Sequence, residues 1–463
     1  MSEETTEYQP NQTDEYVNHI AKVEDTNPTK AVEDIYNDQG ILLLSKGSVI
    51  TKKVAGLLVQ HQLKKELDQS IHVSNTLTVY DILNQTLELI EKESELALLH
   101  QHLDFEVTLR QVLFEKPIPS QVLQRLTVMS RVMPEAYERS LFCSWFVPLI
   151  CKYFKLPYQV YFSAHSAGLA HDIGLMHISE AAATDKHGLT YQQWRALKTH
   201  PIVARMILEG RKLYDEDMLN AVADHHERSD RSGYPAGKPA SQLNTLSQLL
   251  GLADQLYGIY FDPEHGRRSI LAWVPFLEVN ISTFGANNSE ALLALLKVPE
   301  ITNHLNHEVS TEANVEQVLE QNKQVSELFS LAEKLNDIAS QYPRSKPARG
   351  IIELMVQLRW VQDSAGFGSD HLSEWLEWSK ENPDDSSNAE LVEIQDLLSD
   401  LRWRFRRLWR VAVELYWGDN VESKHQKQVK KLFDQMTPLL PCPGRVDDDR
   451  SKGNEDATEP TAQ

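Results

Sequence analysis

The chain has little positive charge, few cysteines and no long apolar run. Its 463 residues carry 46 Lys and Arg against 67 Asp and Glu, which gives a formal net charge of −21 at pH 7. General nucleic-acid binding depends on a basic surface that attracts phosphates, so this balance excludes a binder of that kind. It does not exclude a small phosphate substrate, because bound metal ions can invert the local field.

The three cysteines include no pair with CxxC spacing. This excludes a disulfide scaffold and is typical of a reducing compartment. The first thirty residues are polar and acidic, without the basic start and apolar core of a signal peptide. The richest apolar run, residues 141–154, contains Ser144, Pro148 and Lys152. It is shorter than the roughly 20 residues of a membrane span. We therefore expect a soluble, cytoplasmic protein without a membrane span.

The distribution of apolar residues predicts a mainly α protein with a small α+β module near its N-terminus. Residues 1–28 and the charged tail 445–463 lack a hydrophobic period and are predicted to be disordered. Residues 29–75 predict the module, with a hairpin, a helix capped by Thr51, and a returning strand at 71–73.

The helical period dominates from residue 79 onward. We expect a helical connector at 76–129, a helical domain at 130–298 and a C-terminal helical domain at 313–435, which contains six of the nine tryptophans. The one basic run, residues 401–410, is compatible with an acidic partner, nucleic acid or a membrane surface. The many acids around it favour a core-packed helix whose arginines form ion pairs.

Six histidine and aspartate residues form the most informative pattern. They occur in His-Asp, His-Pro, His-His and Ala-Asp dipeptides, each at one end of an apolar helical stretch, so that all can point into one core. The six residues are His171, Asp172, His200, His225, His226 and Asp254. One such histidine alone would more often be an ordinary core or surface residue, and we interpret His165, His177 and His187 in that way, as surface or loop residues.

Buried imidazoles and carboxylates need partners, because unpaired buried polar groups are costly. Four histidines and two aspartates suit two divalent transition-metal ions, with imidazoles as terminal ligands and a carboxylate as a bridge. Iron or manganese is favoured, and zinc is the alternative. Two such ions about 4 Å apart can aim a hydroxide at a phosphorus atom. The sequence therefore predicts a two-metal phosphohydrolase centre.

These residues resemble the HD-GYP family, a subset of the HD phosphohydrolase superfamily. Residues 171–174 match its HD signature, and residues 189–201 match the stretch before the next ligand. Residues 225–235 match the HHE…GYP signature, and Asp254 matches the last ligand. The resemblance covers residues 130–298.

The resemblance implies a helical domain with a two- or three-metal centre that hydrolyses cyclic di-GMP to the linear dinucleotide or to GMP. It implies that the six residues are metal ligands, with Asp172 as the bridging, catalytic carboxylate. The loop of Gly233, Tyr234 and Pro235 would shape the substrate cleft. Arg228 would either contact a substrate phosphate or pair with Asp230. The module at 29–75 also resembles the segment that precedes some HD-GYP domains.

Three positions depart from the family pattern. Leu175 stands where the family has a lysine, Arg139 where it has a histidine on the first helix of the domain, and Arg231 where it has a glycine. The missing histidine disfavours a third metal ion. The missing lysine removes a cation from the substrate site, which Arg139 or Arg231 could replace.

The leading hypothesis is a cyclic di-GMP phosphodiesterase with slow turnover. One alternative is a degenerate HD-GYP protein that binds cyclic di-GMP or a partner protein without efficient catalysis. Another is a metal phosphohydrolase of a different nucleotide, because fold and metals alone do not fix the substrate. A homodimer or a signalling partner protein is left open, and no nucleic-acid partner is expected.

Overall fold

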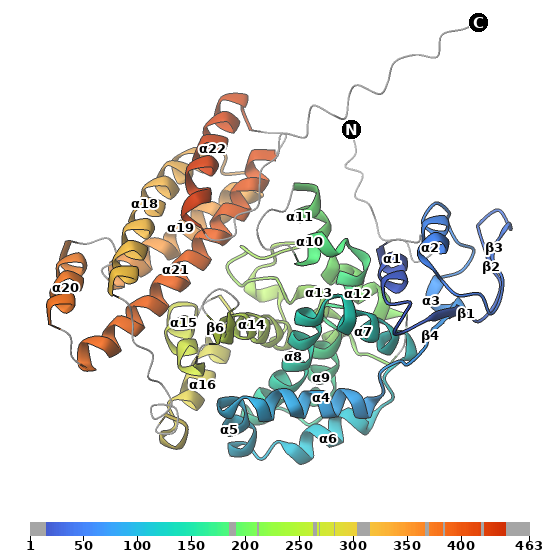
Figure 1. The fold of residues 1–463 in the computed structure, drawn as a ribbon. Coiled ribbons are helices and arrows are strands. Elements are labelled where there is room, and N and C mark those ends of the chain that lie inside the picture. Colours follow the sequence, from blue (N-terminus) through green and yellow to red (C-terminus); the bar gives the residue numbers. More distant parts are fainter. Residues whose placement is uncertain are drawn as a thin grey trace, which may run out of the picture. The chain divides into compact units, whose positions relative to one another are not determined.

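The computed structural model describes most of the chain, namely residues 15–184, 191–210, 213–262, 266–267, 269–281, 283–302, 315–365, 370–382, 385–417 and 421–440. The chain divides into two compact units. The first comprises Met1–Thr184, Ala196–Ala313 and Asn388–Leu397, and the second comprises Asp185–Arg195, Asn314–Ser387 and Leu398–Gln463. Helices dominate and the strands are short (Figure 1), which confirms the mainly α prediction. The domain limits given above stay predictions.

The N-terminal module combines short strands with two short helices. Strand β1 pairs with β4, and β2 pairs with β3, both antiparallel. The elements are β1 (Thr29–Ala31), β2 (Ile35–Tyr36), β3 (Leu42–Leu44), α2 (Lys52–Leu58), α3 (Leu67–Ser70) and β4 (Ile71–Val73). The hydroxyl of Thr51 accepts the backbone N–H of Val54 at 3.3 Å and so caps α2. The predicted hairpin, capped helix and returning strand are confirmed.

A helix at residues 15–22 corrects the prediction that residues 1–28 are disordered. Helix α1 (Glu15–Lys22) buries an apolar face. Its partner lies far along the chain, where His19 Nε2 is 3.0 Å from the carbonyl oxygen of Ile178. A short apolar stripe in a polar segment gives no local sign of such a partner, because tertiary packing supplies most of the stability of a short helix. The predicted tail at 445–463 lies outside the described residues.

Six helices lead from the module to the site. They are α4 (Val79–Lys92), α5 (Ser94–His102), α6 (Glu106–Glu115), α7 (Ser120–Val132), α8 (Pro134–Tyr153) and α9 (Gln159–Ala170). A reciprocal capping box between Thr78 and Asp81 fixes the start of α4. Buried aromatic rings fill the core beside α8, where the centroids of Phe142 and Phe146 are 5.2 Å apart. This packing gives α8 a rigid position in the first unit.

The remaining elements of the first unit follow a short 3-10 helix, η1 (Ile173–His177). They include α10 (Glu180–Thr184), α12 (His200–Glu209), α13 (Glu216–Asp224), η2 (Ala240–Gln242), α14 (Thr245–Tyr260), β5 (Phe261–Asp262), β6 (Gly266–Arg267), η3 (Ile270–Ala272), α15 (Trp273–Val279) and α16 (Ala286–Leu296). Helix α11 (Tyr191–Leu197) runs across the boundary between the two units. Helix α8 packs against α9 and α14, and α13 packs against α9, α12 and α14. These contacts place the ends of four helices around one centre.

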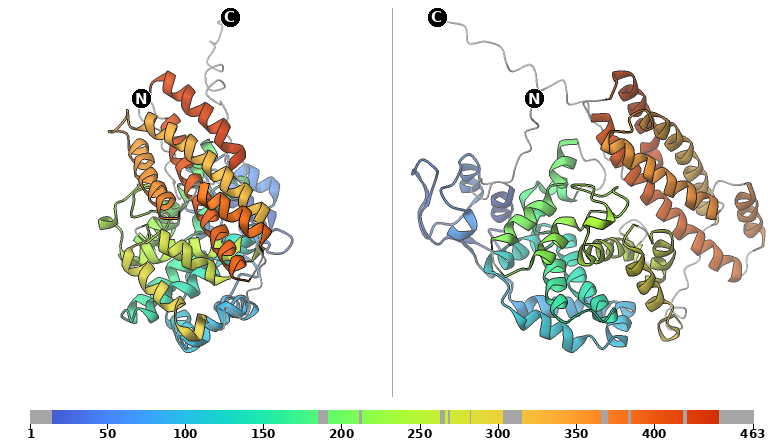
Figure 2. Two further views of the ribbon diagram at one scale, coloured as in Figure 1. Left: turned by 90° about the vertical axis from the view of Figure 1, so that its left-hand side faces the viewer. Right: turned by 180° about the vertical axis from the view of Figure 1, so that it is seen from behind.

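The second unit is a group of helices that run beside one another (Figure 2). They are α18 (Val315–Ala339), α19 (Lys346–Ala365), α20 (Asp370–Glu381), most of α21 (Asp385–Trp417), α22 (Ser423–Met436) and the 3-10 helix η4 (Thr437–Leu439). The ring centroids of Phe405 on α21 and Phe329 on α18 are 4.9 Å apart. No described helix combines the length and the apolar composition that crossing a membrane requires.

The basic run at residues 401–410 lies within α21 and is packed into this unit. Leu401, Phe405 and Leu408 are fully buried. Arg404 donates to Asp400 at 2.8 Å in a buried ion pair, and Arg402 donates to Gln324 at 2.7 Å. The packing therefore supports the interpretation of this run as a core helix rather than a basic binding surface.

Candidate metal centre

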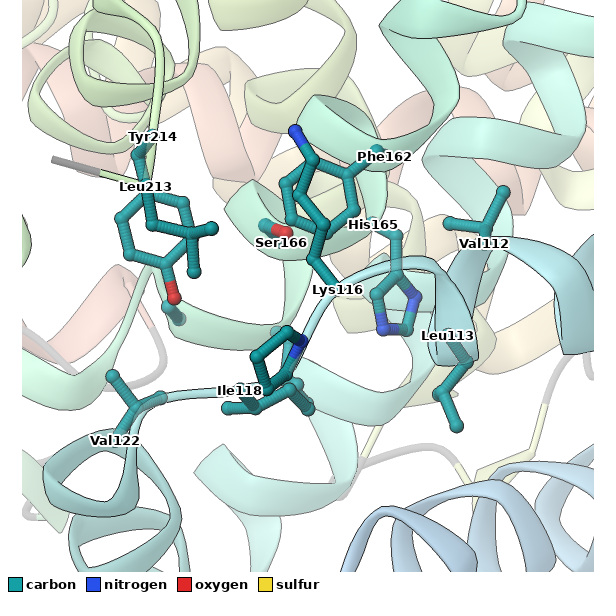
Figure 3. Close-up of a pocket in the computed structure, with 13 residues that line it drawn as sticks. Val112, Leu113, Lys116, Ile118, Val122, Phe162, His165, Ser166, Leu213 and Tyr214 are labelled. Carbon is teal, nitrogen blue, oxygen red and sulfur yellow. The ribbon is translucent and has the colours of Figure 1, made fainter. Parts of the chain in front are cut away.

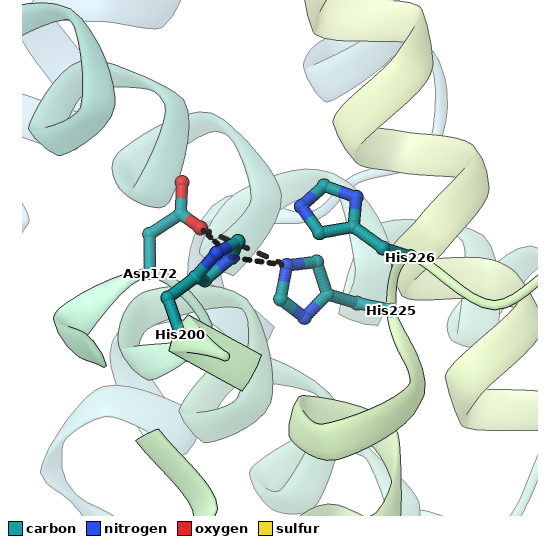
Figure 4. Close-up of side chains that lie close together, drawn as sticks. All are labelled: Asp172, His200, His225 and His226. Carbon is teal, nitrogen blue, oxygen red and sulfur yellow. Dashed lines mark hydrogen bonds and ion pairs between the residues drawn. The ribbon is translucent and has the colours of Figure 1, made fainter. Parts of the chain in front are cut away.

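Four of the six predicted ligands bring their donor atoms within 4.8 Å of one another (Figure 4). They are Asp172, His200, His225 and His226. Asp172 Oδ1 lies 3.2 Å from His200 Nε2 and 3.7 Å from His225 Nε2. The two Nε2 atoms of His200 and His225 are 3.3 Å apart. One carboxylate oxygen therefore faces two imidazoles that come from different helices.

The other two predicted ligands flank this group. His171 Nε2 lies 3.4 Å from Asp172 Oδ2, so each carboxylate oxygen of Asp172 has a different histidine beside it. Asp254 Oδ2 lies 3.7 Å from His226 Nδ1. All six residues thus converge, although they span more than eighty positions of the sequence. A carboxylate with a histidine beside each of its oxygens has the contacts that a bridging ligand needs.

Backbone carbonyl groups fix the orientation of three of the imidazoles. The Nδ1 atoms of His171, His200 and His225 each lie 2.7 Å from the carbonyl oxygen three residues earlier. Because a carbonyl only accepts, Nδ1 carries the proton in all three rings. Their Nε2 atoms therefore keep free lone pairs directed at the centre, which is how a second hydrogen bond commonly fixes a metal-binding histidine.

Two glycines let the elements that carry these residues approach one another. A Cβ atom on Gly174 of η1 would lie 2.0 Å from the carbonyl oxygen of His200. A Cβ atom on Gly251 of α14 would lie 2.4 Å from the carbonyl oxygen of His225. Ordinary contacts at such positions are 3.4–4 Å. Any side chain at either position would push ligand-bearing backbone away from its neighbours.

Burial and charge prepare the group for a cation. Burial lowers the pKa of His225 to about 4, and burial together with the neighbouring His225 and His200 holds the pKa of His226 well below its usual value. Burial opposes ionisation of Asp172, but attraction to His171 outweighs it. This attraction holds the pKa of the Asp172 carboxyl well below its ordinary value. Burial opposes protonation of His171, but attraction to Asp172 outweighs it and raises the pKa of His171. Neutral His225 and His226 beside an ionised Asp172 have the protonation states that metal ligands require, and a metal ion at His171 would take the place of its proton.

These residues fit a divalent transition metal. His171 Nε2 is buried and has no hydrogen-bond partner of its own among the described residues. Such a buried lone pair is costly unless a water or an ion satisfies it. Imidazole nitrogens with carboxylate oxygens are the donor set of iron, manganese and zinc sites. The number and the identity of the ions stay predictions.

The loop predicted to shape the cleft is anchored beside the histidines. The ring of Tyr234 packs on His226 with centroids 4.6 Å apart, and its backbone N–H donates to the carbonyl oxygen of His226 at 3.1 Å. A Cβ atom on Gly233 would lie 2.4 Å from that same oxygen. Pro235 follows directly. Their roles toward a substrate stay predictions.

Glu227 holds this loop in place, a role that the sequence analysis missed. Its buried carboxylate accepts the backbone N–H groups of Ala236, Gly237 and Lys238, the last two at 2.9 and 2.8 Å. The signal was present in the sequence, because an acid directly after two predicted metal ligands is itself expected to be buried and bonded. Glu227 thus ties the residues after Pro235 back to the end of α13.

Arg228 lies inside the protein rather than at an open surface. It is 6% exposed, and its Nη1 donates to the carbonyl oxygens of His225 and Glu227, both at 2.8 Å. Its guanidinium also lies 4.8 Å from the ring centroid of Phe284. These contacts favour a structural role over the predicted phosphate contact.

A small cavity lies beside α6 and α9 (Figure 3). Its volume of about 10 Å³ is the space of a single water, so it does not hold a nucleotide. His165 lines it, is 2% exposed, and donates from Nδ1 to the carbonyl oxygen of Ser144 at 3.0 Å. Burial lowers the pKa of His165 to about 4, so the ring is neutral and its unpartnered Nε2 is a water acceptor.

The prediction that His165 and His177 are surface or loop residues is wrong for His165 and incomplete for His177. His165 is buried because α9 is enclosed on all sides. His177 lies in η1, with its ring centroid 5.6 Å from that of Tyr16 on α1. His187 lies outside the described residues.

The central part of the chain is similar to a known protein family. Residues 109–259 match the model of the HD domain family. A cyclic di-GMP phosphodiesterase of Pseudomonas aeruginosa is 30% identical over 106 residues, which are 23% of this chain and 25% of that protein. The 3'3'-cGAMP-specific phosphodiesterase 3 of Vibrio cholerae is 28% identical over 137 residues, which are 28% of each chain.

A second Vibrio cholerae protein, 3'3'-cGAMP-specific phosphodiesterase 1, is 30% identical over 88 residues, which are 19% of this chain and 20% of the relative. This chain spans about a quarter or less of the length of these relatives. The family match at residues 109–259 contains the six predicted ligands. The predicted resemblance to the HD superfamily is confirmed by this family match. The central part of this chain is similar to HD domains and to bacterial phosphodiesterases of cyclic dinucleotides.

Proposed function

We propose that this protein is a metal-dependent phosphodiesterase of the HD-GYP type that hydrolyses cyclic di-GMP. The convergence of His171, Asp172, His200, His225, His226 and Asp254 carries the proposal, because no simpler role explains so many buried ligand groups around one carboxylate. The relative from Pseudomonas aeruginosa supports the substrate. The GYP loop supports the HD-GYP type, since it packs directly on His226.

The cofactor is two divalent transition-metal ions, with iron or manganese favoured and zinc as the alternative. When bound, such ions activate a water nucleophile and neutralise charge on the phosphate. Asp172 faces His171 with one oxygen and His200 with the other, which supports its assignment as the bridging, catalytic carboxylate. The Nδ1 atoms of His171, His200 and His225 donate to backbone carbonyl oxygens and so hold these rings in the ligand orientation.

The loop of Gly233, Tyr234 and Pro235 forms one wall of the substrate cleft in this proposal. Tyr234 presents an aromatic ring beside His226, a surface on which a nucleobase can stack. Glu227 keeps the loop rigid by binding three backbone N–H groups that follow it. A rigid wall positions the phosphodiester relative to the nucleophile, which is a main source of catalytic rate.

Two observations favour other functions. Leu175, at a position where a lysine would add a cation, is buried, which favours the degenerate protein that binds cyclic di-GMP or a partner without efficient catalysis. Two relatives act on 3'3'-cGAMP, which favours a different cyclic dinucleotide as substrate. A homodimer or a signalling partner protein remains a prediction.

The test is turnover by the full chain purified without oxygen and assayed with each cyclic dinucleotide. We expect slow, metal-dependent conversion of cyclic di-GMP to the linear dinucleotide or GMP, abolished by Asp172→Asn. Faster hydrolysis of 3'3'-cGAMP would replace the substrate but keep the chemistry. Binding of cyclic di-GMP by the metal-loaded protein without any product would establish the binding protein instead.

A further inference from the structure

Arg139 reaches the edge of the metal centre from α8. Its Nη1 donates to Asp254 Oδ1 at 3.2 Å, while the other oxygen of Asp254 faces His226. The Arg139 side chain is 26% exposed, whereas that of Asp254 is 7% exposed. One guanidinium therefore lies between the buried ligand group and the space outside it.

The guanidinium is held in a defined place. Its Cζ atom lies 5.2 Å from the ring centroid of Tyr257 on α14, a distance at which a cation is attracted to an aromatic face. Its Nη2 is 3.6 Å from Glu135 one turn earlier on α8. Because Glu135 is half exposed, that second pair contributes little energy. Asp254 and Tyr257 are the contacts that fix the position.

Part of the hydrogen-bonding capacity of Arg139 is unused. Its Nε atom is buried and has no hydrogen-bond partner among the described residues. A guanidinium offers five N–H groups in a planar fork that matches two oxygens of a phosphate. A buried donor without a partner, beside a carboxylate that faces a metal ligand, indicates that a further acceptor belongs there.

Two other cations, Lys238 and Arg228, already have acceptors within the protein. Lys238 donates to both oxygens of the buried Asp224 at 2.8 Å. Arg228 donates to the carbonyl oxygens of His225 and Glu227. Arg139 differs from both, because its buried Nε has no hydrogen-bond partner among the described residues and its carboxylate partner is itself part of the ligand group. Its charge is therefore placed to act on an anion bound at the metals.

We propose that Arg139 is a substrate-binding residue that donates to a non-bridging phosphate oxygen of the phosphodiester while Asp254 keeps it in place. This inference rests on the proposed function, because it assumes a phosphodiester at the metal centre. The competing role is purely structural, in which Arg139 only orients Asp254. The two roles differ in what happens to metal content and to phosphate binding when the guanidinium is removed.

The test compares Arg139→Gln and Arg139→Lys with the wild type in the metal-loaded full chain. Arg131→Gln, at an exposed position of α7, is the matched control. Metal content per chain is measured by mass spectrometry, binding of inorganic phosphate by calorimetry, and KM and kcat with cyclic di-GMP. Inorganic phosphate is used because its binding needs no nucleotide recognition.

We expect Arg139→Gln to keep its metal and to bind phosphate at least about tenfold more weakly, a loss typical of one charge-assisted hydrogen bond. Arg139→Lys retains a charge and loses the fork, so its loss is smaller, and Arg131→Gln matches the wild type. With cyclic di-GMP, KM rises more than kcat falls in Arg139→Gln.

Three results would overturn the inference: unchanged phosphate binding in Arg139→Gln, loss of metal in parallel with phosphate binding in both Arg139 variants, or no phosphate binding by the metal-loaded wild type. If the wild type binds phosphate through Arg139 but hydrolyses no cyclic dinucleotide, the proposed function fails while this inference stands. The phosphate titration and the turnover assay therefore separate the two failures.

Discussion

Two glycines on α14 lie seven residues apart, and replacing each with alanine should change the free energy of unfolding in opposite directions. Gly251 faces the carbonyl oxygen of His225, and Gly258 has open space where a Cβ atom would lie. In a helix interior, alanine is more favourable than glycine by about 0.5–1 kcal/mol. Gly258→Ala should therefore raise the free energy of unfolding by about that amount.

Gly251→Ala adds a clash that exceeds this gain. The new Cβ atom would lie 2.4 Å from the His225 carbonyl oxygen, against 3.4 Å or more in ordinary contacts, so the backbone must move by about 1 Å. Overpacking of this kind costs about 1–3 kcal/mol. Metal–ligand distances tolerate only about 0.2 Å. We therefore expect a less stable protein that also loses metal.

The assay is denaturant unfolding of the full chain together with metal content by mass spectrometry, for both variants and the wild type. Gly258→Ala should keep its metal and unfold at a higher denaturant concentration. Gly251→Ala should unfold at a lower concentration and carry less metal. Equal stabilisation by both substitutions, with full metal content, would refute the claim that close contact between α14 and His225 positions the site.

Three further predictions concern single residues. Arg231 has a φ of 64°, in the left-handed backbone region, at a position where the family has glycine. Arg231→Gly should therefore stabilise the protein by about 1 kcal/mol, while Arg231→Ala should not. A loss of stability of Arg231→Gly in denaturant unfolding would contradict this. The folded-state pKa of His165 is about 4, below the ordinary 6.5, so the unfolded chain takes up the proton first and stability falls as pH decreases through this window. His165→Gln should lose about 2 kcal/mol less than the wild type between pH 7.5 and 5 in urea unfolding, and equal losses would argue against it. Glu227→Gln leaves one acceptor oxygen for three backbone donors and should lower the free energy of unfolding by about 1–3 kcal/mol. Amide hydrogen exchange at residues 236–238 should become faster. Unchanged exchange would show that the loop does not depend on Glu227.

The sequence predicted the convergence of the site residues because each lies at the end of an apolar helical stretch. His171 follows α9, His225 follows α13, and His200 begins α12. Helix ends that bury their apolar faces against one another bring such residues together. The N-terminal module was predictable for a similar reason, since the cap of Thr51 and the strand at 71–73 are local signals.

Features set by distant parts of the chain could not be predicted in this way. Helix α1 depends on a contact near residue 178, more than 150 positions away. Arg139 was recognised only as a departure from a pattern, and its pairing with Asp254 required the packing of α8 against α14. The burial of His165 likewise depends on the enclosure of α9. The hydrophobic period of a helix indicates which of its faces is buried, but not which distant helix packs against that face.

The metal content of the wild type and of Asp172→Ala, both purified without oxygen, tests the central claim most directly. The six converging residues predict about two transition-metal ions per wild-type chain. Loss of the carboxylate between His171 and His200 should remove most of this metal, because both neighbours lose their shared partner. A wild type without metal, or an Asp172→Ala variant with full metal content, would contradict the account.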